Sequence, residues 1–288
     1  MPSLKQIKRR ISSIKNTQQI TRAMKMVAAA KLRRAQENII KARPYSHKLR
    51  EVIKDLSGRC DRSQHPLLAV REPKEIGVVV ITADRGFCGG FNTNIIKRAV
   101  KEIESFETID PTIQMMTIGK KGSDYFAKND YNVLQRHDQL FQDLHFGVAA
   151  SVGESLIDFY KQEKLDRVYL IYNEFKSAIQ QNLIVEQLLP IIPDEPEETT
   201  TSQVDFIYEP DPLQVLSGVL PLYVNVQMWR VFLESNAAEH GARMTAMENA
   251  TNNANELIDT LTLTYNKARQ AAITKELLEV VSGAEGLK

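Results

Sequence analysis

The chain has 288 residues, 43% of them hydrophobic, which is enough for one or two domains with apolar cores of their own. Its net charge of +1 conceals an uneven distribution, since residues 1–60 carry a net charge of +13, residues 61–211 one of −10 and residues 212–288 one of −2. The basic arm indicates an acidic partner, such as nucleic acid, anionic lipid or acidic protein loops. The two cysteines, Cys60 and Cys88, argue against a disulfide framework, and no apolar run approaches the roughly 18 residues of a membrane-spanning helix.

The first predicted element is one long helix over residues 1–57. Ser3 and Gln6 have the spacing of a capping box, in which each side chain accepts a hydrogen bond from the other residue's backbone N–H. Apolar residues then recur at intervals of three and four, as in a coiled-coil seam, and we expect this phase to slip at Gln18 and Gln19. Pro44 is expected to kink the helix and Gly58 to end it. The predicted seam consists of Leu4, Ile7, Ile11 and Ile14, followed by Ala28, Leu32, Ala35, Ile39, Ala42, Tyr45, Leu49, Val52 and Leu56.

The middle of the chain is predicted to be a linker over residues 58–75 and an α/β domain over residues 76–211. Its expected strands are residues 76–83, 112–118, 167–173, 183–192 and 204–208, and its expected helices are residues 91–106, 123–128 and 144–161. Strands that alternate with helices indicate a sheet with both faces covered. We therefore expect a Rossmann-like domain.

The last predicted element, residues 212–288, is a second long helix. Asp211 is its expected N-cap and Pro212 its first helical residue, and no proline occurs from residue 222 to residue 281. Ser282 and Gly283 are expected to end it. A seam with intervals of three and four runs through Val226, Trp229, Leu233, Ala237, His240, Met244, Met247, Thr251, Ala254, Ile258, Leu261, Tyr265, Ala268 and Ala272.

The two long helices can bury their seams by pairing antiparallel, because the first runs toward the middle domain and the second runs away from it. The predicted fold class is therefore α/β, with a long antiparallel two-helix coiled coil formed by the N- and C-terminal segments and an inserted Rossmann-like α/β domain. The second helix is the longer, so its last ~15 residues would extend about 20 Å past the first. That end is too apolar to be left in water, so we expect a partner to enclose it. Its apolar residues are Ile273, Leu277, Leu278, Val280 and Val281.

Four segments resemble the bacterial type of the F-type ATP synthase gamma subunit family. They are residues 22–31 (RAMKMVAAAK), 84–92 (DRGFCGGFN), 208–212 (YEPDP) and 265–277 (YNKARQAAITKEL), and the resemblance covers the whole chain in order. It implies a rotating central stalk whose helix pair lies within a ring of alpha and beta subunits, which carry the nucleotide sites. The α/β domain would rest, with the epsilon subunit, on the membrane-embedded ring of c subunits, at the cytoplasmic face of the bacterial plasma membrane.

The resemblance also implies contact residues but no catalytic, cofactor-binding or metal-binding residue, since this subunit is a non-catalytic part of the proton-transporting ATP synthase. No cofactor is expected, and no thiol switch, because the cysteine-bearing insert of the chloroplast form is absent. Phe206 stands where some relatives have tyrosine. The implied contacts with the alpha–beta ring are Met24, Lys25, Arg269, Gln270, Thr274 and Glu276, with Ile273, Leu277, Leu278 and Val280 as the apolar tip. The implied contacts at the c-ring and epsilon foot are Phe206, Tyr208 and Glu209.

Other interpretations remain open. The glycine-rich residues 86–90 lie between a predicted strand and helix, where a phosphate-binding loop would lie, but they lack the spacing of either phosphate-loop motif and are better explained as a tight turn. A nucleotide-using enzyme is therefore one rival, and an adaptor that binds nucleic acid through the basic arm is another. The five histidines have no metal-ligand spacing, and Cys88 has no histidine partner. The first 36 residues lack Asp and Glu, as a transit peptide would, but the helical pattern continues beyond them and favours a mature protein that begins here.

Overall fold

The computed structural model describes residues 3–59, 65–106, 111–192, 209 and 211–285. They divide into two compact units, of which unit 1 consists of Met1–Ala28 with Met244–Lys288 and unit 2 of Ala29–Arg243. The two terminal helices, α1 (Leu4–Arg59) and α5 (Pro212–Glu285), each contribute to both units. The predicted long helices are thus confirmed, and each is a few residues longer at its C-terminal end than the sequence indicates.

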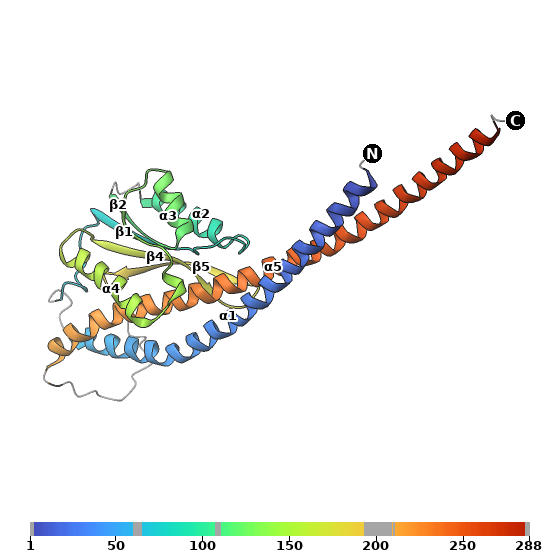
Figure 1. The fold of residues 1–288 in the computed structure, drawn as a ribbon. Helices are drawn as coiled ribbons and strands as arrows, with labels where there is room; N and C mark the ends of the chain where they lie inside the picture. The colour runs from blue at the N-terminus through green and yellow to red at the C-terminus, as the bar shows by residue number, and fades with distance from the viewer. Residues whose placement is uncertain (1–2, 60–64, 107–110, 193–208, 210, 286–288) are drawn as a thin grey trace. The chain divides into compact units, whose positions relative to one another are not determined.

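Unit 2 contains a five-stranded sheet in the order β3-β2-β1-β4-β5 (Figure 1). Four strands are parallel, and β5 pairs antiparallel with β4. The predicted alternation of strands and helices is confirmed. The elements of the sheet domain are β1 (Glu75–Ile81), α2 (Phe91–Phe106), β2 (Thr112–Ile118), α3 (Lys120–Lys128), β3 (Val133–His137), the short 3-10 helix η3 (Leu140–Gln142), α4 (Phe146–Lys161), β4 (Arg167–Phe175) and β5 (Gln181–Leu189).

The bounds of β1, β4 and β5 differ from the predicted ones by up to three residues, and two other strands differ more. β3 was not predicted, because it is a five-residue edge strand in which Gln135, Arg136 and His137 interrupt any apolar pattern. The predicted strand at residues 204–208 lies outside the described residues.

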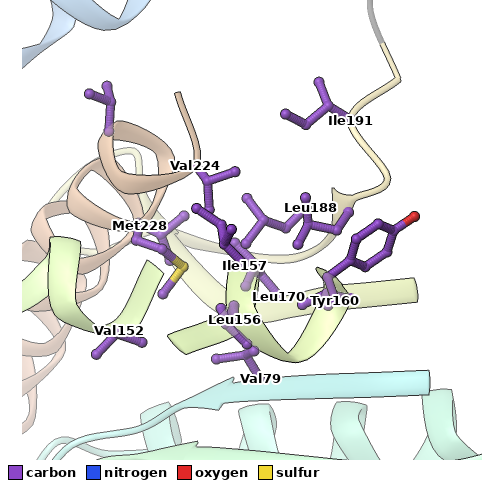
Figure 2. Packing of buried hydrophobic residues seen from close by; sticks show 14 of the residues in the cluster. Val79, Val152, Leu156, Ile157, Tyr160, Leu170, Leu188, Ile191, Val224 and Met228 are labelled. Carbon is purple, nitrogen blue, oxygen red and sulfur yellow. The ribbon is translucent and has the colours of Figure 1, made fainter. Parts of the chain in front are cut away.

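The two faces of the sheet are covered by different helices. On one face, α4 and the first part of α5 pack against Val79, Leu170 and Leu188, as Figure 2 shows. On the other face, α2 and α3 pack against Val78, Val80 and Met115. Ala238 of α5 belongs to this second cluster although earlier residues of α5 belong to the first, so α5 reaches the apolar cores of both faces.

Helix α5 is covered nearly all round over residues 224–241, where only Trp229, Arg230, Asn236 and His240 are half-buried and the rest are buried. A single seam was predicted here, but a helix that packs on a sheet and on neighbouring helices has no free side. Asp211 caps its start as predicted, since its Oδ1 accepts hydrogen bonds from the backbone N–H groups of Leu213 and Gln214 at 2.9 and 3.0 Å. The predicted end at Ser282 and Gly283 is wrong, because both residues lie inside the helix.

Unit 1 is a pair of helices formed by the two ends of the chain. The predicted capping box is present, with Ser3 N donating to Gln6 Oε1 at 3.0 Å and Gln6 N donating to Ser3 Oγ at 3.3 Å. The predicted phase slip at Gln18 is wrong. The intervals of three and four continue without a break, but several of the seam positions hold polar side chains instead of apolar ones. The buried and half-buried seam positions of α1 in this unit are Leu4, Ile7, Ile11, Ile14, Gln18, Thr21, Lys25 and Ala28.

The remainder of the α1 seam lies in unit 2 and shows one further difference. Ser46 is buried there, whereas Tyr45, which we had placed in the seam, is exposed. Ser46 fits because its hydroxyl donates to the carbonyl oxygen of Arg43 at 2.9 Å, which satisfies it within the helix. Pro44 lies inside α1, which continues past it as predicted.

Candidate functional site

The loop that follows β1, residues 84–90 (the β1 loop), is held by side chains on both sides of it. Asp84 Oδ1 accepts hydrogen bonds from Lys120 N at 3.0 Å and from Gln139 N at 2.8 Å. Asn92, in the first turn of α2, accepts from Ala83 N at 2.9 Å and donates to the carbonyl oxygen of Arg85 at 3.4 Å. These bonds join the β1 loop to the segments that follow β2 and β3, at the carboxyl edge of the sheet.

The β1 loop turns its backbone acceptors toward α5. Arg243 Nη2 donates to the carbonyl oxygen of Gly86 at 3.2 Å and to that of Arg85 at 3.5 Å. A phosphate-binding loop needs the opposite polarity, with several backbone N–H groups converging on one point. The geometry therefore agrees with a tight turn, in which Phe87 and Gly89 have φ values of 60° and 58°.

Arg243 is itself largely buried and is paired. Its Nη1 lies 2.6 Å from Glu239 Oε1, one helical turn earlier, and the two side chains are 12% and 9% exposed. Burial raises the pKa of Glu239, and the guanidinium of Arg243 opposes that shift. Burial, then Arg243 and Lys31, lower the pKa of His240 to about 4, so its imidazole is neutral near pH 7. One carboxylate and one guanidinium thus compensate each other inside the domain.

Glu239 and Arg243 were not singled out in the sequence, although a signal for them exists. They stand four apart among Ala237, Ala238, Gly241 and Ala242, a stretch of small residues with no polar face on which charges could be solvated. Gly241 is needed for the close approach, because a Cβ there would lie 3.3 Å from the carbonyl oxygen of Ala178. A charged pair in a small-residue stretch indicates a buried contact to main chain.

Cys88 is a buried free thiol within the β1 loop. Its Sγ lies 3.3 Å from Asn92 Nδ2, and burial raises the pKa of the thiol. Both features agree with the predicted packing role and argue against a nucleophile, which needs a lowered thiol pKa.

The predicted contact residues of α1 lie in unit 1 and face different ways. Lys25 Nζ pairs with Glu248 Oε1 at 2.7 Å across the helix pair, although both side chains remain more than one-third exposed. Met24 is half-buried, whereas Ile20, Met26 and Val27 are exposed. This stretch thus carries polar residues in the seam and apolar residues outside it.

The predicted contact residues near the end of α5 also lie in unit 1. The side chains of Ile273, Leu277, Leu278, Val280 and Val281 are between 48% and 70% exposed. Arg269, Gln270, Thr274 and Glu276 are exposed as well, and Thr274 Oγ1 donates to the Gln270 carbonyl oxygen at 3.0 Å. Of the predicted foot residues, Glu209 is exposed, while Phe206 and Tyr208 lie outside the described residues.

Two kinds of feature are absent from the described residues. No cluster of His, Cys, Asp and Glu side chains within them has the arrangement of a metal site. None of the helices in this part of the chain is both long and apolar enough to cross a membrane.

Comparison with known proteins gives a consistent result over the full length. A family model described as "ATP synthase" matches residues 3–287. The ATP synthase gamma chain of Chlorobaculum parvum is 50% identical over 292 residues, which is all of both chains, and that of Chloroherpeton thalassium is 46% identical over all of this chain and 99% of its own.

Solved structures agree in fold. A chain from the Euglena gracilis mitochondrial ATP synthase matches with a TM-score of 0.71 and 24% identity, over 99% of this chain and 94% of that one. A chain from the central stalk and c-ring of the Tetrahymena thermophila enzyme matches with a TM-score of 0.60, over 80% and 99%. These likenesses confirm the predicted fold class and give no support to a nucleic-acid adaptor.

Proposed function

The chain belongs to the ATP synthase gamma family, and from this premise we propose how it works as the rotating central stalk of an F-type ATP synthase. The observation that carries the proposal is unit 1: a helix pair with a polar seam, apolar residues on its outside and an apolar end that its own chain leaves exposed. Exposed apolar surface of this kind suits a partner that encloses it. We assign this role to the ring of alpha and beta subunits.

The mechanism rests on asymmetry. A single rod inside a ring with three catalytic sites cannot contact all three alike, so it favours a different conformation at each site through differential contact energy. Turning the rod passes these conformations around the ring, and the rotation and the nucleotide affinities are therefore coupled in both directions. Ion flow through the membrane sector turns the stalk for ATP synthesis, and ATP hydrolysis turns it backward.

We assign partner contacts to the exposed residues of unit 1. Arg269, Gln270, Thr274 and Glu276 make polar contacts with the ring, and Ile273, Leu277, Leu278 and Val280 fill an apolar collar in it. Met24 and Lys25 contact acidic loops of the beta subunits. Lys25 can exchange Glu248 for an acidic residue of the ring at little cost, because both side chains of this pair are more than one-third exposed.

We assign contacts with the c-ring and the epsilon subunit to Phe206, Tyr208 and Glu209. The chain itself is non-catalytic, since the ring carries the nucleotide sites, and it is held peripherally at the cytoplasmic face of the bacterial plasma membrane through the complex. The division into a helix at residues 1–57, a linker at 58–75, an α/β domain at 76–211 and a helix at 212–288 remains a prediction.

The proposed function is tested first by co-purification. A tagged full-length chain is expected to bring down a nucleotide-binding ring of two kinds of subunit together with c subunits. Isolation of the chain alone, or with nucleic acid that high salt releases, would overturn the assignment.

A second test addresses the apolar end. Replacing Ile273, Leu277, Leu278 and Val280 with glutamine keeps the helix propensity but removes the apolar contacts, each worth on the order of 1–2 kcal/mol when buried. We expect ATP-driven proton pumping by the assembled complex to fall by about tenfold or more, since one factor of ten corresponds to roughly 1.4 kcal/mol. The control is Ile179→Gln, at an exposed position of unit 2 between β4 and β5, and it should pump normally. Equal pumping by both variants would contradict the proposal that an apolar collar of the ring encloses this end of α5.

A further inference from the structure

The sheet of unit 2 has the topology of a nucleotide-binding domain, but α5 occupies the place where a ligand would lie. The chain winds from β1 outward to β2 and β3 and then returns to β4 on the other side of β1. In sheets of this kind ligands bind at the carboxyl ends of the strands, at the position where the winding direction reverses, which here lies between β1 and β4.

Helix α5 is bound to the carboxyl ends of both of these strands by buried charges. Glu234, 5% exposed, accepts a hydrogen bond from the backbone N–H of Phe175, the last residue of β4, at 3.1 Å. Glu239, five residues later, holds Arg243, which donates to the carbonyl oxygens of the β1 loop. Between them, Ala238 is fully buried among residues of the second apolar cluster. The crevice of the sheet is thus filled by a helix of the same chain.

Buried charges are an expensive way to hold a helix if stability were the only requirement. An apolar pair of similar volume is often as stable as a buried ion pair, so the charges need another explanation. Directional bonds resist twisting and sliding, whereas apolar contacts are non-directional. Arg243 is also the last residue of unit 2 on α5.

We propose that Glu239 and Arg243 form a latch that fixes α5 to the β1 loop and transmits turning force between this helix and the sheet. Arg243 acts as the positioning residue, because its guanidinium joins the Glu239 carboxylate to two backbone carbonyl groups. Glu239 supplies the charge that allows the guanidinium to be buried. The latch rests on the proposed function for its purpose, but its geometry is independent of that function.

The test uses a double variant, Glu239→Gln with Arg243→Met. Changing both residues avoids leaving one buried charge without its partner, and the unbranched side chains keep the volume. The matched control is Arg98→Met with Glu102→Gln, an ion pair of the same residue types and spacing on α2, with 3.0 Å between its charged atoms and more exposed side chains.

The first measurement is the rate at which a thiol reagent modifies Cys88 in the purified full chain, with Cys60 replaced by serine. Loss of the latch frees the β1 loop, so the double variant should react about tenfold faster, because local opening exposes the buried thiol more often. The control should react at the original rate. An unchanged rate in the double variant would show that Arg243 does not hold the loop and would overturn the latch.

The second measurement is the number of protons pumped per ATP hydrolysed by the assembled complex. A loosened attachment should lower this ratio at least about twofold while ATP hydrolysis continues, since a weakened coupling free energy affects the transfer of force rather than the chemistry. A faster thiol reaction with a normal ratio would overturn the force-transmitting role. If the double variant does not assemble, Arg243→Lys, which keeps the charge but not the planar fork, should show an intermediate rise in thiol reactivity.

These outcomes are distinguishable from failure of the proposed function. If the unaltered chain assembles with no nucleotide-binding ring, the pumping measurement fails for every variant, whereas the thiol rate still decides whether the latch exists.

Discussion

Residues 224–241 and residues 249–281 belong to the same helix, α5, but their surroundings differ. In the first stretch nearly every side chain is buried, including Glu234, Ser235 and Glu239. In the second, the half-buried positions follow a single narrow line and the last apolar residues are exposed. The rest of the chain therefore buries the first stretch on nearly every side, whereas it leaves most of the second stretch exposed. Exposed apolar residues on a regular helix are what we expect of a surface that a partner covers, as proposed above.

The largest expected effect is a difference in how much a substitution in each stretch lowers the free energy of unfolding. Phe232 is fully buried in the first stretch, and Phe232→Ala should lower the free energy of unfolding by about 3–5 kcal/mol. Leu278 is 62% exposed in the second, and Leu278→Ala should change it by no more than about 0.5 kcal/mol. Urea unfolding of the full chain, followed by circular dichroism and by the fluorescence of the single tryptophan, measures both. Similar losses would mean that the two stretches are equally packed.

The next effect is a pH dependence confined to the buried stretch. Because the folded-state pKa of His240 is about 4, below its ordinary value, the unfolded chain binds a proton between about pH 6.5 and pH 4 that the folded chain does not. Stability is therefore lost as the pH falls through this range, and His240→Gln should recover on the order of 2–3 kcal/mol at pH 4 relative to pH 7.

Neighbouring groups contribute to the same pH range, so the comparison is between variants. The raised pKa values of Glu234 and Glu239 act in the opposite direction and are present with or without His240. His145→Gln, which replaces an exposed histidine, is the control. An equal shift for both variants would contradict the prediction.

A smaller effect is expected in the polar part of the helix pair. Thr21 and Thr251 face each other with 2.8 Å between their hydroxyl oxygens. Replacing both with valine removes both polar partners at nearly the same shape and should stabilise the pair by roughly 1 kcal/mol. Thr21→Val alone should stabilise it less, because the Thr251 hydroxyl then keeps only its bond to the carbonyl oxygen of Met247, at 2.7 Å. Thermal unfolding by circular dichroism decides between them. A double variant no more stable than the single one would show that the pair of hydroxyl groups does not lower the stability of the helix pair.

The smallest effect contrasts two ion pairs. Lys25 and Glu248 are 38% and 47% exposed, so a double-mutant cycle should give a coupling of less than about 1 kcal/mol, which 0.5 M salt abolishes. The buried pair of Glu239 and Arg243 should show a larger coupling that salt hardly changes. A salt-insensitive coupling between Lys25 and Glu248 would mean that unit 1 is less open to water than its exposure indicates.

Much of the fold could be predicted because periodicity is a local property. The helix at residues 91–106 and the strand at residues 112–118 agree with the structure at both ends, since each is rich in apolar residues. The errors lie where tertiary contacts decide. Gln18 and Lys25 occupy the seam because Asn255 and Glu248 face them, and no pattern within one helix reveals that pairing.

The candidate sites were predictable to different degrees. The apolar end of α5 follows from helix lengths and composition alone. The buried pair of Glu239 and Arg243 depends on a loop more than 150 residues away in the sequence, as the contact from Arg243 to Gly86 shows. Composition can suggest that such a charged pair needs a partner, but only the folded chain supplies the partner's identity.

The polar seam of unit 1 also sets a length. The residue numbers joined by its three cross-helix contacts, Gln18 with Asn255, Thr21 with Thr251 and Lys25 with Glu248, add up to 272 or 273. If this antiparallel register continues along the pair, Leu4, the first residue of α1, lies opposite about residue 269. Beyond that point α5 has no residue of α1 opposite it. A shift of the register by one heptad would lengthen or shorten this unpaired part of α5 by roughly 10 Å. Three hydrogen-bonded pairs thus fix the register of the two helices, and the register determines how far α5 extends beyond the start of α1.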